Sequence, residues 1–149
     1  MQITQNNTAN AHSILSYGIG KITLSTTPDG QLPAGAKLVS EPDETDKPIV
    51  FDWFKSIIVT PSNINTEWKP QHYSELTLDD FGHILERKPE VVLLGTGKTL
   101  VFPPREISLV LAKKNIGLEV MDTKAACRTY NFLMNDGRDV AAALFMIQD

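Results

Sequence analysis

The segment VVLLGTGKTLVFPPREISLVLAKKNIGLEVM, residues 91–121, decides the fold of this chain. Its first residues, 91–94, form a short continuous apolar run, which is typical of a strand buried on both faces of a sheet. The prolines at 103 and 104 open a helix, and a second apolar strand follows at 118–121. This order predicts a β-α-β unit with two parallel strands joined by a helical crossover.

The residues on either side of this unit add two helices and a strand. Asp122 and Thr123 provide a cap for a helix after the unit, and an Asp-Gly pair then turns the chain into a long apolar strand at 140–147. We expect that strand at the centre of the sheet. Before the unit, Thr77 caps a shorter helix that Pro89 ends.

The first half of the chain favours strands. Apolar and polar residues alternate over 17–24, with a slip at Gly20-Lys21 that we interpret as a bulge or bend. Further strands are expected at 36–39, 49–54 and 57–60. Two segments are typical of connections, namely a turn at Pro28-Asp29-Gly30 and an acidic, proline-bounded loop at 41–48.

Composition places the chain among globular proteins. Its 149 residues, 42% apolar and 21% charged, suit one domain with a single core. We expect a flexible polar head at 1–12 and a single α/β domain at 13–149. A net charge of −4 argues against nucleic-acid binding, which depends on clustered Lys and Arg. The single cysteine, Cys127, excludes an internal disulfide and a Cys-based zinc cage.

Neither a targeting signal nor a membrane span is predicted. The first residues lack the pattern of a secretory signal or a transit peptide, and no apolar run approaches the roughly 20 residues that cross a bilayer. We therefore expect a cytoplasmic protein. No spacing of His, Cys, Asp or Glu predicts a metal site, and neither a cofactor nor a catalytic set is predicted.

The segment Gly95-Thr96-Gly97-Lys98 invites a nucleotide-binding interpretation because it follows a strand. Its spacing argues against one: a phosphate loop needs Gly at position 92, which is Val, and a dinucleotide fingerprint needs Gly at position 100, which is Leu. The glycines still allow backbone N–H groups to turn toward a small anion beside Lys98. The alternative is a tight turn that needs small residues.

The parallel unit brings this loop and the next helix to the carboxyl edge of the sheet, where open α/β sheets bind ligands. Asp122 and Thr123 would line the same crevice from the start of that helix. Arg128, Asn131 and Asn135 follow an i, i+3, i+7 spacing on one polar stripe. The stripe is either part of a binding site or a solvated helix face.

Cys127 lies in the first turns of that helix, where the helix dipole favours a thiolate. No general base accompanies it in the sequence, so a buried and inert thiol is the stronger interpretation. Three aromatic side chains, Trp53, Phe54 and Trp68, would anchor a partner if they were exposed. Core packing is the preferred role for Phe54.

Four segments carry a resemblance to a known family: 92–98 (VLLGTGK), 102–104 (FPP), 117–131 (GLEVMDTKAACRTYN) and 136–144 (DGRDVAAAL). They resemble the mitochondrial complex I assembly factor 3 family and its uncharacterised prokaryotic relatives, which share an Mth938-like fold. The match is close over 76–145 and looser over 17–68. It implies a three-layer α/β fold with a mixed central sheet. It also implies a chaperone-like role, joining other assembly factors in building complex I, without enzymatic activity.

Two functional hypotheses follow, with a minor third. The leading hypothesis is a non-enzymatic interaction or assembly factor with protein partners, in respiratory complex I biogenesis. The alternative is a small-molecule or anion-binding protein, or an enzyme, that uses the carboxyl-edge crevice, with Gly95 to Lys98 holding an anion and Arg128 and Asn131 orienting the ligand. The third is a thiol sensor at Cys127. The oligomeric state is not predicted.

Overall fold

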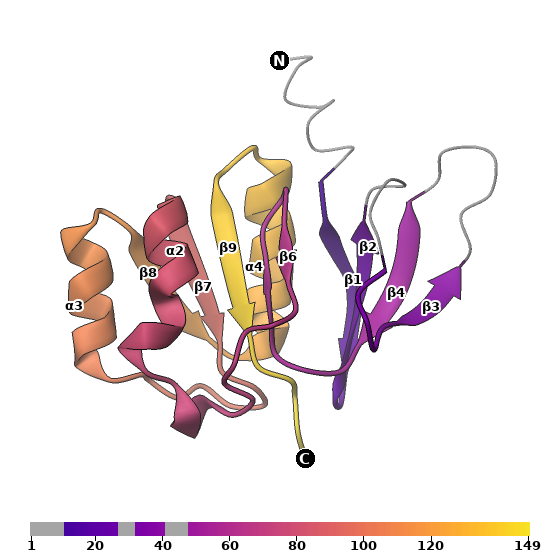
Figure 1. Ribbon diagram of the computed structural model, residues 1–149, viewed down its shortest axis with the longest axis horizontal. Helices are drawn as coiled ribbons and strands as arrows, with labels where there is room; N and C mark the ends of the chain where they lie inside the picture. Colours follow the sequence, from indigo (N-terminus) through magenta and orange to yellow (C-terminus); the bar gives the residue numbers. More distant parts are fainter. Residues whose placement is uncertain (1–10, 27–31, 41–47) are drawn as a thin grey trace.

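The computed structural model describes residues 11–26, 32–40 and 48–149 (Figure 1). The predicted turn at 28–30, most of the acidic loop at 41–48 and most of the head at 1–12 lie outside the described residues. His12, at the end of the predicted head, is described and is buried. Its backbone N–H donates to Pro61 O over 3.0 Å, so this residue is tied to the domain.

The strand-rich first half forms a sheet of its own. Its strands are β1 (Ser13–Gly18), β2 (Lys21–Thr26), β3 (Lys37–Ser40) and β4 (Ile49–Trp53), in the antiparallel order β1-β2-β4-β3. The slip at Gly20-Lys21 is therefore neither a bulge nor a bend within one strand, because Gly18 pairs with Lys21 across a hairpin turn. Gly20 has φ +69°, a conformation that glycine adopts without strain.

The second sheet is the mixed one. It contains β5 (Ile57–Val59), β6 (Ile64–Asn65), β7 (Val91–Gly95), β8 (Gly117–Met121) and β9 (Val140–Leu144), in the order β6-β5-β9-β7-β8. β7 is parallel to both β8 and β9, whereas β5 is antiparallel to β9 and β6. The α/β fold, the mixed sheet, the parallel unit and the central place of the last strand are thus confirmed.

The last strand is shorter than predicted. β9 ends at Leu144, and Phe145 N still donates to Gly95 O over 2.9 Å. Ile147 instead forms an isolated parallel bridge with Ile19, and its carbonyl accepts from Gly20 N over 2.6 Å. The apolar run thus continues past the strand because its last residues join the second sheet to the β1–β2 turn.

Of the three described α-helices, the last two begin where local sequence signals predict, whereas the helix expected after Thr77 begins as a 3-10 turn. A 3-10 turn, η2 (Leu78–Phe81), leads into α2 (Gly82–Arg87), and Asp80 accepts from Thr77 N over 2.8 Å. α3 (Arg105–Lys113) begins directly after the two prolines, and α4 (Thr123–Asn135) begins after Asp122, whose carboxylate accepts from Ala125 N over 2.9 Å. A further 3-10 turn, η1 (Tyr73–Glu75), was not predicted.

The two faces of the mixed sheet are buried by different elements. One face packs against α4 and the four-stranded sheet, in a core that includes Ile22, Leu93 and Tyr130. The opposite face packs against α2, α3 and the 3-10 turns, in a core that includes Phe81 and Ile107. Figure 1 shows this order, with α2 and α3 on one side and the four-stranded sheet on the other.

Candidate functional site

Thr123 fixes the loop at the carboxyl edge of the parallel strands. Its side chain is fully buried, and its hydroxyl accepts from Gly97 N over 2.8 Å and donates to Phe145 O over 2.7 Å. Its own N–H donates to Gly97 O over 2.9 Å, and Thr96 N donates to Met121 O over 2.9 Å. The amides of Thr96 and Gly97 are therefore already bonded within the fold rather than turned toward a ligand.

The glycine at 95 is required by packing. A Cβ at this position would lie 3.0 Å from Thr123 Oγ1 and from Leu144 Cδ2, and 3.1 Å from Ala126 Cβ. Any larger residue would push α4 away from β7 and β9. Gly97 has φ +102°, so it supplies the left-handed backbone of the turn. These constraints support the role of this loop as a tight turn.

A small cavity of about 240 Å³ lies beside this loop. Its walls come from Thr96 to Thr99, from residues 71–73 at the start of η1, and from residues 145, 146 and 148 after β9. Lys98 forms an exposed ion pair with Asp149, Nζ to Oδ1 3.2 Å. An ion pair this exposed is weak, so the ammonium group remains available to an anion in the cavity.

Two residues of the polar stripe of α4, Arg128 and Asn131, contact β1 of the same chain. Asn131 accepts from Ile14 N over 3.0 Å and donates to Ile14 O over 2.5 Å, as a neighbouring strand would. Arg128 donates to the Tyr17 hydroxyl over 2.9 Å. The structure thus brings Thr123 to the glycine loop, whereas Arg128 and Asn131 contact the edge of the four-stranded sheet.

Cys127 is only 1% exposed. Burial raises the pKa of its thiol to about 12, and the nearby Arg128 charge only partly opposes that effect. The thiol is therefore protonated at neutral pH, which makes it a poor nucleophile. Asp122, the remaining predicted site residue, serves as the cap of α4.

Exposed apolar side chains gather at the same end of the molecule. Leu100 and Phe102, in the loop between β7 and α3, are 50% and 74% exposed. Tyr73 lines the small cavity together with that loop, and it is 38% exposed. Ile19 is 68% exposed in the β1–β2 turn, which the Ile147 bridge holds at this end. The loop and the turn lie along the lower edge of Figure 1.

Phe54 completes this group, which we call the carboxyl-end surface (Ile19, Phe54, Tyr73, Leu100 and Phe102). It follows Trp53, which pairs with Ile22 beside the β1–β2 turn, and it is 44% exposed. The expectation of a core role for Phe54 is therefore wrong. Trp53 and Trp68 are both buried, so Phe54 alone is exposed among the three aromatic residues considered as partner anchors.

A larger hollow lies on the face of the mixed sheet that α2 covers only in part. This hollow, the β6–α2 groove, has a volume of about 610 Å³. Its floor is formed by Ile58, Ile84 and Ala141, and its rim by polar residues from β6 and α2. Nothing in the sequence pointed to this groove, because β6 has only two residues and was not predicted.

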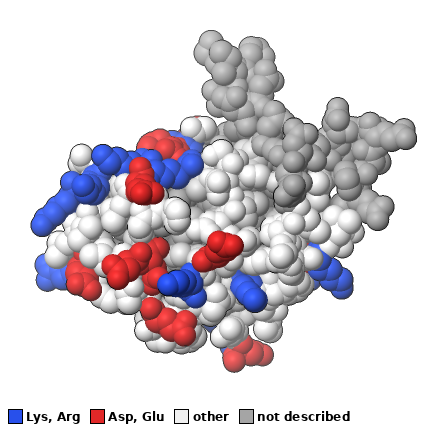
Figure 2. All heavy atoms as spheres, viewed as in Figure 1, with Lys and Arg blue, Asp and Glu red and all other residues white. Residues whose placement is uncertain are grey.

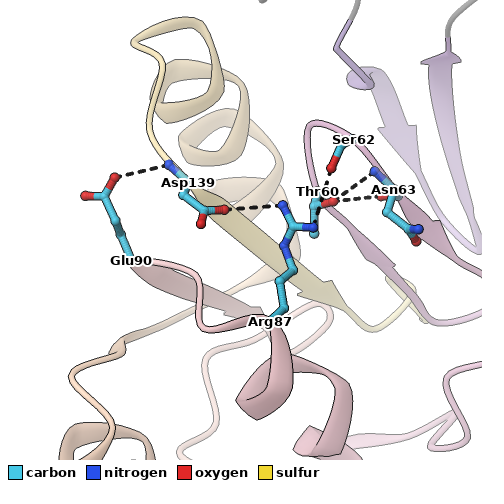
Figure 3. Close-up of polar contacts among 6 residues, drawn as sticks. All are labelled: Thr60, Ser62, Asn63, Arg87, Glu90 and Asp139. Atoms are coloured by element: carbon cyan, nitrogen blue, oxygen red, sulfur yellow. Dashed lines mark hydrogen bonds and ion pairs between the residues drawn. The ribbon is translucent and has the colours of Figure 1, made fainter.

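One end of the groove is fixed by a polar cluster. Figure 3 shows Arg87 reaching from α2 between Asp139 and Ser62, with distances of 3.3 Å to the carboxylate and 3.4 Å to the hydroxyl. Asp139 N donates in turn to Glu90 over 3.2 Å, and Arg138 donates to Glu90 over 3.0 Å. These contacts join α2 to the start of β9.

Charges of both signs occupy the surface. On the face drawn in Figure 2, Lys and Arg gather at the upper left with Asp and Glu among them, and charges of both signs spread over the lower half. Within the part of the chain that the structure describes, no three His, Cys, Asp or Glu side chains lie together as a metal site would require. Nor is any described helix long and apolar enough to cross a membrane.

The known proteins similar to this chain include an assembly factor. The human NADH dehydrogenase (ubiquinone) 1 alpha subcomplex assembly factor 3 is 34% identical over 80 residues, which are 52% of this chain and 44% of the human protein. A Francisella tularensis protein named 13 kDa major membrane protein is 39% identical over 61 residues, which are 41% of this chain and 50% of that protein. The chain spans about half the length of the curated relatives it matches.

Solved structures share the fold of this chain. A crystal structure of a Bordetella parapertussis protein has a TM-score of 0.68 and 26% identity, covering 91% of this chain and 96% of that one. A Bordetella pertussis protein described as an Mth938-like domain has a TM-score of 0.62 over 93% of this chain and 87% of that one; at 23% identity it shows the fold alone. A model of a family described as protein of unknown function (DUF498/DUF598) matches residues 48–145. The chain therefore belongs to the DUF498/DUF598 family and has the Mth938-like fold.

Proposed function

We propose that this protein acts by binding other proteins, as a non-enzymatic interaction or assembly factor. The carboxyl-end surface carries this proposal. The surface gathers exposed apolar side chains at one end of the molecule, and aromatic residues contribute most of the energy of protein interfaces. Phe102, with 74% of its surface exposed, is the natural anchor of the surface.

The curated relatives support an assembly role. The human relative is named as an assembly factor of NADH dehydrogenase, so components of respiratory complex I biogenesis are the proposed partners. The net charge of −4 and the mixed surface favour a protein over a nucleic acid. A cytoplasmic location belongs to this proposal as well.

A small-molecule or anion-binding function is the second candidate, and the cavity beside Lys98 favours it. Its volume of about 240 Å³ is below the usual range of ligand pockets, roughly 300–1,000 Å³, so only a small anion would fit. In that case phosphate or a small carboxylate should raise the melting temperature, and Lys98→Ala should abolish the shift. Thermal scans across such anions that leave the melting temperature unchanged would rule this function out.

Photo-crosslinking tests the leading proposal directly. We would place benzoylphenylalanine at Phe102 in one protein and at Phe132 in a second. The two side chains are nearly equally exposed, at 74% and 71%, but Phe132 lies on α4, outside the carboxyl-end surface. After irradiation in cells, the Phe102 probe should capture a specific partner that the Phe132 probe does not. Equal capture by both probes, or none by either, would contradict the proposal.

A further inference from the structure

The β6–α2 groove has the shape of a binding site, and it lies outside the carboxyl-end surface. Its floor is apolar and buried: Ile58, Ile84 and Ala141 are 5%, 2% and 0% exposed. The groove has depth for two reasons. Ala141, at the floor, has a small side chain, and α2, on one side of the groove, has only six residues.

The rim of the groove carries an excess of negative charge. Glu67, which follows β6, and Glu86, on α2, both line the groove and are exposed. Among the described residues, neither carboxylate forms an ion pair. The guanidinium of Arg87, by contrast, is already paired with Asp139 at 3.3 Å. A ligand with a positive charge is therefore complementary to this rim.

The β6 side of the rim suits a peptide backbone. Asn63, Asn65 and Thr66 line it with amide and hydroxyl groups, which both donate and accept hydrogen bonds. Within the described part of the chain, β6 pairs only with β5, so no strand is paired along its other edge. An extended segment can lie along such an edge while its alternate side chains enter an adjacent groove.

We propose that the β6–α2 groove binds an extended segment of a partner protein in which apolar residues alternate with Lys or Arg. The apolar side chains pack on the floor, and the basic side chains approach Glu67 and Glu86. This inference deepens the proposed interaction role and rests on it for the nature of the partner. The groove and the carboxyl-end surface share no residue, so the two can be tested separately.

The probe is a set of three fluorescent heptapeptide mixtures, acetylated and amidated at their ends. Val, Ile, Leu or Phe occupies alternate positions, and the positions between are all Lys, all Gln or all Glu. Fluorescence anisotropy with the purified protein should show the tightest binding for the Lys mixture, with affinity that falls as salt is added. The double variant Glu67→Gln/Glu86→Gln should weaken that binding roughly tenfold, since two exposed ion pairs are lost.

The control is Glu106→Gln/Glu119→Gln, which removes two exposed carboxylates from α3 and β8, outside the groove. It changes the net charge equally and should leave binding unchanged. Equal binding of the Lys and Glu mixtures, equal loss in both double variants, or no binding of any mixture would overturn the inference. Competition by hexylamine as strong as by the unlabelled peptides would show a site for small cations instead. None of these results depends on partner capture at Phe102, so failure here leaves the proposed function standing.

Discussion

Thr123→Val should destabilise the protein by about 2–4 kcal/mol. The substitution preserves the shape of the side chain but removes the hydroxyl that joins two segments. Gly97 N then loses its acceptor and Phe145 O loses its donor, both in the interior. A buried polar group left without a partner costs about 1–3 kcal/mol, and the added apolar surface of Val offsets a small part of the two costs.

Urea unfolding followed by tryptophan fluorescence measures this effect, since Trp53 and Trp68 are both buried. Thr123→Ser keeps the hydroxyl, so it should cost only about 1 kcal/mol for the lost methyl group. Thr129→Val on the same helix is the matched control, because the Thr129 hydroxyl forms no hydrogen bond to the described residues; it should change stability by less than about 0.5 kcal/mol. If Thr123→Val proved no more damaging than Thr129→Val, the Thr123 contacts would not hold the loop as described.

Four further predictions concern α4 and His12. Asn131→Ala should cost about 1–3 kcal/mol and speed hydrogen exchange at Ile14 N, because both side-chain bonds to β1 are lost; unchanged exchange would contradict the anchoring role. Cys127 should react with iodoacetamide at least about a hundredfold more slowly in the folded protein than in urea, because burial raises its thiol pKa to about 12. The raised pKa also makes stability depend on pH, because the thiol ionises at a lower pH in the unfolded chain than in the folded protein. The free energy of unfolding should therefore fall as the pH rises from about 9 toward 12, and it should fall less in Cys127→Ala. Burial lowers the pKa of His12, so stability should fall as the pH drops below about 6.5, where the unfolded chain binds the proton first. On acidification, the urea midpoint should therefore decline more for the wild type than for His12→Gln. Equal declines would exclude a contribution of His12 to the pH dependence of stability.

Local signals in the sequence predicted the second half of the fold well. These signals are the apolar run of β7, the two prolines before α3 and the Asp122 cap. Each of them determines the backbone conformation only of residues close to it in the sequence. The structure therefore matches them closely. The sequence allows either an anion site or a tight turn at the glycine loop, and the bonded amide and positive φ of Gly97 favour the turn. These features depend on short-range geometry, which a single sequence contains.

Features that depend on distant partners could not be predicted in this way. Asn131 reads as a solvated residue on a helix, and only the fold shows that its partner, Ile14, lies 117 positions away. The exposure of Phe54 follows from its place one residue beyond the end of β4. The two-residue strand β6 is too short to produce any alternation, so the groove beside it left no trace in the pattern.

The central claim is that the carboxyl-end surface holds a protein partner. Quantitative mass spectrometry of proteins captured with the tagged chain, after crosslinking in cells, tests it with two double variants. Leu100→Ser/Phe102→Ser alters the surface, whereas Leu109→Ser/Phe132→Ser alters equally exposed apolar residues on α3 and α4. The account predicts that the first variant loses the partner, with respiratory NADH dehydrogenase components foremost among those lost, while the second retains it. Retention of every partner by the first variant, or equal loss from both, would contradict the claim.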